Sequence, residues 1–137
     1  MIWGAKKTGL ALLMTAFIST AASAADVVGR YQTEANDEGN NLHVDIAPCA
    51  DNAGKLCGTI AAAYAADGAT NDAYEHLGRL VVWDMQPKED GFWTKGKIWA
   101  PDTDKTYNSE MRLAGDTLAV KGCVFVICRG QDWQKQK

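Results

Sequence analysis

Short β-rich runs separated by clusters of turn-forming residues make up the chain from residue 28 onward, and this pattern constrains the fold more than any other feature. Apolar and polar residues alternate clearly in residues 42–46 and 107–113, which is typical of strands with one buried face. No long stretch has the period of an amphipathic helix. The pattern predicts eight strands, at residues 28–33, 42–47, 56–61, 80–85, 92–99, 106–113, 117–123 and 129–135.

The connections between most of these strands are short. Compact turns rich in glycine, asparagine and aspartate are expected at residues 36–41, 88–91, 101–104 and 114–116. Successive strands are therefore antiparallel neighbours, and an open sheet of this size would leave two unpaired edges. We predict an all-β fold, a single antiparallel up-and-down barrel of about eight strands, with a two-sheet β-sandwich as the alternative.

One segment, residues 62–78, is longer than an ordinary hairpin loop. It is rich in alanine and contains Tyr64, Tyr74 and His76. Long loops in compact domains often act as lids or binding loops, so these three residues are loop candidates for a site. The alternative is a short helix or an ordered loop that covers one end of the barrel.

Residues 1–24 have the composition of an export signal. A positive start at Lys6 and Lys7 precedes a short apolar core at residues 10–18, and Ala22-Ser23-Ala24 offers the small residues that a signal peptidase recognises. The apolar core is well short of the ~20 residues that cross a bilayer, which argues against a membrane anchor. We therefore predict a signal peptide cleaved after Ala24, with cleavage after Ala25 as a nearly equal alternative.

The mature product is then a β-barrel domain at residues 25–137 that is exported to a bacterial periplasm or outside the cell, with no transmembrane segment. The whole chain has a net charge of -3. Loss of residues 1–24 removes two lysines and no acidic residue, which leaves 12 Lys and Arg against 17 Asp and Glu, a net charge of -5. An acidic surface repels phosphate backbones, so we expect no nucleic-acid partner.

Four cysteines remain in the mature domain, an even number that suits disulfides in an exported protein. Three pairings are possible. Cys49 follows one predicted strand and Cys57 lies at the start of the next, while Cys123 and Cys128 flank a second short connection. We predict local pairing, Cys49 with Cys57 and Cys123 with Cys128. A four-cysteine zinc site is the rival interpretation, but neither pair has the C-x2-C spacing.

Groups suited to catalysis are scarce. Ser109 is the only serine of the mature domain and lies on the apolar side of its strand, and His43 and His76 are the only histidines. His43 alternates outward, and His76 with Asp72 and Glu75 would make only a weak metal site in an acidic loop. No glycine-rich phosphate loop is present. We expect no catalytic residues, no metal, no cofactor and no enzymatic activity.

Several motifs together resemble a family of exported bacterial proteins known as domain of unknown function 2147. They are Gly29-Arg30-Tyr31, the hairpin of residues 47–60, residues 96–102 followed by Lys105-Thr106-Tyr107, Gly122-Cys123, Cys128-Arg129 and Trp133. The resemblance implies a lipocalin-like, or calycin-type, barrel and brings no established reaction. It also implies a barrel-closing pair, because in lipocalins an aromatic residue of the first strand meets an arginine near the last; here these would be Tyr31 and Arg129.

The mature domain is rich in aromatic residues. Four of them, Tyr31, Trp93, Tyr107 and Trp133, are candidates to line a cavity for a small, partly apolar ligand. An eight-stranded barrel is, however, just narrow enough to be filled by its own side chains. Our leading hypothesis is non-enzymatic ligand binding, and the alternative is an interaction or inhibitor module that contacts another envelope protein through its loops. The sequence leaves the oligomeric state open.

Overall fold

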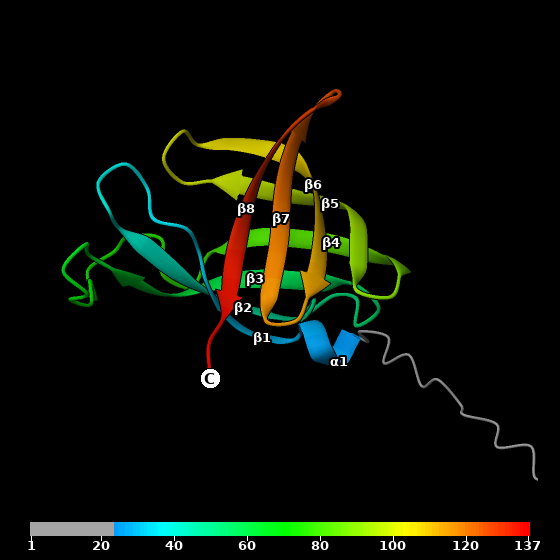
Figure 1. The fold of residues 1–137 in the computed structure, drawn as a ribbon, viewed down its shortest axis with the longest axis horizontal. Coiled ribbons are helices and arrows are strands. Elements are labelled where there is room, and N and C mark those ends of the chain that lie inside the picture. The colour runs from blue at the N-terminus through cyan, green and yellow to red at the C-terminus, as the bar shows by residue number, and fades with distance from the viewer. Residues whose placement is uncertain (1–23) are drawn as a thin grey trace, which may run out of the picture.

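A computed structural model describes residues 24–137, which form a closed antiparallel barrel preceded by one turn of helix (Figure 1). Each strand pairs with its neighbours in the sequence, and β8 returns to pair with β1. All eight predicted strands and the up-and-down barrel are confirmed, and the sandwich alternative is wrong. The elements are α1 (Ala24–Val27), β1 (Gly29–Gln32), β2 (Asn41–Pro48), β3 (Leu56–Tyr64), β4 (Leu80–Glu89), β5 (Phe92–Ala100), β6 (Lys105–Ala114), β7 (Thr117–Val124) and β8 (Ile127–Lys135).

The alternation in the sequence becomes the two faces of the barrel wall. Along β2, Val44 and Ile46 are buried, and along β6 the buried residues are Ser109 and Met111. Successive side chains of a strand point to opposite faces, so these residues line the interior while their neighbours face solvent. Seven of the eight strands extend beyond their predicted bounds, whereas β1 is shorter than predicted.

A β-bulge in β5 shifts the pairing with β6. Trp93 lies opposite Met111, but the next pair is Gly96 with Ser109, so β5 has one extra residue in this interval. Lys95 within the bulge has a positive φ of 59°. The bulge keeps both Trp93 and Gly96 on the interior side of the wall.

The two ends of the barrel differ. The closed end carries α1 and the turns at residues 49–55, 90–91 and 115–116, and Val27 of α1 is completely buried there. The open end carries the turns at residues 33–40, 65–79, 101–104 and 125–126. In Figure 1 the β7–β8 hairpin rises above the rest of the barrel at this open end.

Both predicted disulfides are present, Cys49 with Cys57 and Cys123 with Cys128, and no cysteine among residues 24–137 is free. The first joins the ends of β2 and β3 at the closed end, and the second joins β7 and β8 at the base of the projecting turn. The predicted signal peptide lies, except for its last residue, outside the described residues. Of those that are described, none belongs to a helix with the length and apolar character that a membrane crossing requires.

Candidate functional site

Three of the four predicted lining residues fill the closed end of the barrel. Tyr31, Trp93 and Trp133 are each at most 5% exposed and belong to one apolar core. The Tyr31 hydroxyl donates a 2.8 Å hydrogen bond to the carbonyl of Val27, and burial raises the pKa of Tyr31 to about 12. These side chains therefore fill the barrel interior at its closed end, and we call this filled layer the floor.

The predicted barrel-closing pair of Tyr31 and Arg129 is not formed. Tyr31 lies opposite Lys135 of β8, six residues along the strand from Arg129. Arg129 lies opposite Gly122, close to the β7–β8 turn, and is exposed. At ~3.3 Å of rise per residue the two positions are roughly 20 Å apart. The prediction is wrong because the register of β8 on β1 could not be obtained from the sequence.

The wall of the barrel is incomplete beside β8. This strand pairs with β7 along its whole length, but it pairs with β1 only through Gln134 and Lys135. Within the described part of the chain, the edge of β8 from Ile127 to Trp133 has no second strand beside it. Residues 127–132 are all exposed, including those that alternate toward the interior.

Interior-facing residues near this gap form a half-open surface that we call the mouth face. Tyr107 lies opposite Ile98, and both are half-buried. On the β7–β8 hairpin, Gly122 lies opposite Arg129 and Val124 lies opposite Ile127. These four residues are on the same face of the hairpin as the buried Val120 and Trp133, which is the face toward the barrel interior. The mouth face comprises Ile98, Tyr107, Gly122, Val124, Ile127 and Arg129.

Close packing at Gly122 holds the mouth face together. A Cβ at Gly122 would lie 3.2 Å from Cγ2 of Ile98 and 3.4 Å from Cβ of Tyr107. Toward the closed end, the Trp133 indole N–H donates a 3.0 Å hydrogen bond to Oε1 of Gln131. Gln131 therefore lies between the buried Trp133 and the exposed Arg129 of the mouth face. The mouth face thus offers apolar side chains together with one exposed guanidinium, that of Arg129.

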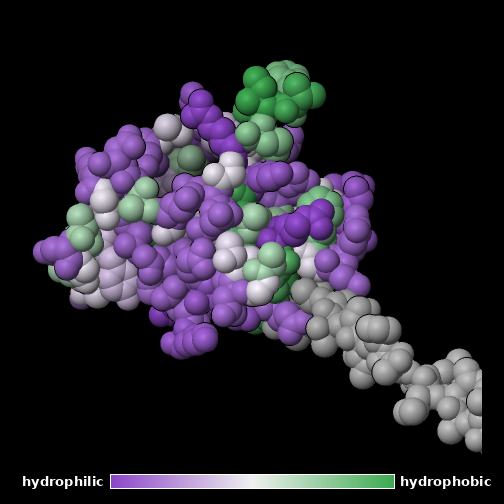
Figure 2. Space-filling view, in the orientation of Figure 1, coloured by the Kyte–Doolittle hydropathy of each residue, from purple (hydrophilic) through white to green (hydrophobic). Residues whose placement is uncertain are grey.

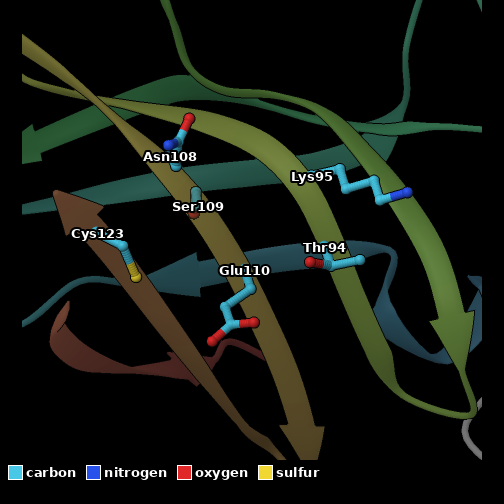
Figure 3. Close-up of a pocket in the computed structure, with 6 residues that line it drawn as sticks. All are labelled: Thr94, Lys95, Asn108, Ser109, Glu110 and Cys123. Carbon is cyan, nitrogen blue, oxygen red and sulfur yellow. The ribbon is translucent and has the colours of Figure 1, made fainter. Parts of the chain in front are cut away.

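Two hollows of about 440 Å³ each lie on the wall instead of inside it. The first, shown in Figure 3, is at the β5 bulge and is lined by Thr94, Lys95, Asn108, Ser109, Glu110 and Cys123. Asn108, Glu110 and Cys123 alternate with interior residues, so their side chains face outward. The second is lined by Asn52, Gly54, Lys55, Gln86 and Pro87. Both are open depressions of the outer wall and lie away from the mouth face.

The long loop packs against Trp99 of β5. The guanidinium carbon of Arg79 lies 3.4 Å from the centroid of the Trp99 ring, and His76 meets the same ring edge-on at 4.9 Å. The Trp99 indole N–H donates a 2.8 Å hydrogen bond to Oδ1 of Asp104. Trp99 is only 4% exposed although it follows the interior-facing Ile98, so the loop covers the outer side of the wall here.

The three loop candidates therefore have structural contacts. Tyr74 lies edge-on to His76, with ring centroids 5.3 Å apart, and burial raises the pKa of Tyr74. Tyr64 belongs to β3 instead of the loop and contacts the ring of His43 at 4.5 Å. The alternative prediction was a segment that covers one end of the barrel, but these contacts place the loop on the outer side of the wall at Trp99. The sequence did not single out Trp99 and Arg79, since an aromatic residue near a strand end carries no signal of what covers it.

Residues suited to catalysis do not converge within residues 24–137. The Ser109 hydroxyl is buried and has no hydrogen-bond partner there, while both histidines contact aromatic rings. One group of three potential metal ligands comes together, Cys49, Asp51 and Asp84. Since Cys49 is oxidised in a disulfide, this group offers two carboxylates and no thiolate.

The comparisons with known proteins agree with this architecture. A solved structure described as protein HP1028 from Helicobacter pylori, which belongs to the lipocalin family, matches with a TM-score of 0.62 over 80% of this chain and 82% of that one. The two sequences are 15% identical, so the likeness concerns the fold alone. None of the curated proteins compared with this chain is similar to it in sequence. The family described as uncharacterized protein conserved in bacteria (DUF2147) matches residues 29–135, and this chain belongs to that family.

Proposed function

We propose that this protein is exported and that it binds, without catalysis, a small and partly apolar ligand at the mouth face. The observation that carries the proposal is the exposure of interior-facing residues above the Trp133 floor. Val124 is 49% exposed and Ile127 is 71% exposed, although both continue the interior side of the β7–β8 hairpin. Apolar surface at the open end of a barrel is where a small molecule gains most from leaving water.

The chemistry of the mouth face suggests which ligands fit. Tyr107 of β6 and Ile98 of β5 offer apolar contact area next to Gly122 of β7. Arg129 is exposed on the same side of the hairpin, and none of the ion pairs among residues 24–137 involves it. We therefore propose a ligand with an apolar body and an anionic or strongly polar end, oriented by the guanidinium of Arg129.

Binding of the anionic apolar dye 1-anilinonaphthalene-8-sulfonate, followed by its fluorescence, tests this proposal. Tyr107→Ala should weaken binding about tenfold, because it removes the largest apolar side chain of the mouth face. Thr106→Ala is the matched control, since Thr106 is exposed on the opposite side of the same strand. Arg129→Gln should weaken binding severalfold and reduce its dependence on salt.

Two results would contradict the proposal. One is a wild-type protein that binds neither the dye nor any member of a panel of fatty acids and aromatic acids. The other is equal loss of binding in the Tyr107 and Thr106 variants. The export part is tested separately by cell fractionation and by N-terminal sequencing of the mature protein, which should begin at Ala25 or Asp26; a cytoplasmic protein that begins at Met1 would refute it.

A further inference from the structure

The turn between β7 and β8 presents an exposed apolar tip, Val124–Ile127. Phe125 and Val126 are each 95% exposed, and they are flanked by Val124 and Ile127, which belong partly to the mouth face. Figure 2 shows this tip as a hydrophobic knob that stands out from a largely hydrophilic face. Four consecutive exposed apolar residues are costly in water, and such patches mark interaction sites.

The tip is held in a fixed shape. Cys123 and Cys128 lie directly opposite each other on β7 and β8, and their disulfide closes the hairpin immediately below the tip. Phe125 has a positive φ of 53°, which gives the turn its tight geometry. A turn that is already ordered loses little conformational entropy when it binds, so little of the free energy gained by burying its apolar surface is offset.

Positive charge surrounds the tip on a domain that is otherwise acidic. Lys121 and Arg129 flank the hairpin end, and residues 121–129 contain no acidic residue. On the neighbouring strand β6, Glu110 lies opposite Lys121 and offsets one of these positive charges. Lys97 lies opposite Asn108, which in turn lies opposite Cys123, so a third cation is within two strands of the disulfide. Residues 25–137 together carry a net charge of -5. The cations near the tip therefore complement an anionic surface and oppose the charge of the rest of the domain.

We propose that the Val124–Ile127 tip inserts into the interface of an anionic lipid bilayer. Apolar residues beside lysine and arginine are the combination that binds at bilayer interfaces. The acidic β1–β2 turn, which contains Asp37 and Glu38, stands well apart from the tip in Figure 1, so it does not oppose this approach.

Co-sedimentation of the mature protein with vesicles of equal parts phosphatidylcholine and phosphatidylglycerol tests the proposal. The double variant Phe125→Asn with Val126→Ser should lower vesicle binding about tenfold or more, and asparagine tolerates the positive φ at position 125. Leu77→Ser is the matched control, because Leu77 is an exposed apolar residue in a different turn. Lys97→Gln with Lys121→Gln should weaken binding to these vesicles and leave weak binding to pure phosphatidylcholine unchanged.

A second readout locates the inserted residue. Phe125→Trp should show a blue shift of tryptophan emission when vesicles are added, compared with the wild type, which has the same other tryptophans. Absence of vesicle binding by the wild type, or an unchanged affinity in the Phe125 and Val126 variant, would overturn the proposal. Capture of a protein by the tip without any vesicle binding would overturn it as well. Dye binding is tested at Tyr107, which lies outside the tip, so failure of this proposal and failure of the proposed function are distinguishable.

Discussion

Gly96 is the position where the interior of the barrel tolerates a change least. A Cβ built on Gly96 would lie 2.0 Å from Sδ and 2.9 Å from Cγ of Met85, and 2.8 Å from the carbonyl oxygen of Trp83. Met85 is completely buried and cannot swing into solvent, and the Trp83 carbonyl belongs to the neighbouring strand. Gly96→Ala therefore requires both a side chain and a strand backbone to move.

The expected cost follows from these contacts. Overpacking of a well-packed core costs about 1 to 3 kcal/mol, and this site lies at the upper end because one of the clashes is with backbone. Replacing glycine also reduces the entropy of the unfolded chain, which offsets about 0.4 to 1 kcal/mol. We expect Gly96→Ala to lower the free energy of unfolding by about 2 kcal/mol, or to lower Tm by about 8 °C for a domain of this size.

Urea denaturation with the disulfides intact measures this effect. Gly130→Ala in β8 is the control, since its Cβ would have only ordinary contacts, 3.5 Å from Cγ of Lys121 and 3.7 Å from the carbonyl oxygen of Val120. In a Met85→Ala background the cost of Gly96→Ala should shrink by more than about 1 kcal/mol. Equal stabilities of the Gly96 and Gly130 variants would refute the packing described for β4 and β5.

Four further changes have defined outcomes. Replacing Cys123 and Cys128 by serine should cost about 2 kcal/mol in urea and also weaken vesicle binding, although the apolar tip residues are unchanged. Folding lowers the pKa of His43 from 6.5, mainly through burial and secondly through the charge of Arg30. The free energy of unfolding should therefore decrease as the pH falls through 6.5 toward the pKa of the folded state. His43→Gln should reduce this decrease in unfolding curves measured over a series of pH values. Ser109→Ala removes a buried hydroxyl without a partner among residues 24–137 and should raise the free energy of unfolding by about 1 kcal/mol. Arg79→Ala should lower it by roughly 1 kcal/mol and increase proteolysis of the long loop, because the cation above Trp99 is lost.

The strands and both disulfides could be predicted because each is determined by residues that are close together in the sequence. Alternation in β2 and β6 identified the buried faces, and the short turn between Cys49 and Cys57 limited their reach. The helix α1 was missed because four residues carry too little periodicity to be recognised. Tyr31, Trp93 and Trp133 were predicted to line a ligand cavity, and the sequence could not show that their side chains pack together in the core.

Features that depend on long-range register could not be predicted. The expected contact between Tyr31 and Arg129 failed because β1 pairs only with the last two residues of β8. The same short pairing leaves the gap in the wall that exposes the mouth face. The tip was visible in the sequence as a short connection between Cys123 and Cys128, but its exposure depends on how far β7 and β8 extend beyond the barrel.

Ligand binding at the mouth face, above a floor filled by aromatic side chains, can be observed residue by residue. Titration of the isotope-labelled mature protein with 1-anilinonaphthalene-8-sulfonate, followed by backbone amide NMR shifts, tests it most directly. Binding at the mouth face should give saturable shifts concentrated at Ile98, Tyr107, Gly122 and Arg129, with little change around Tyr31. Shifts centred on Tyr31 and α1, or a uniform absence of shifts, would contradict it.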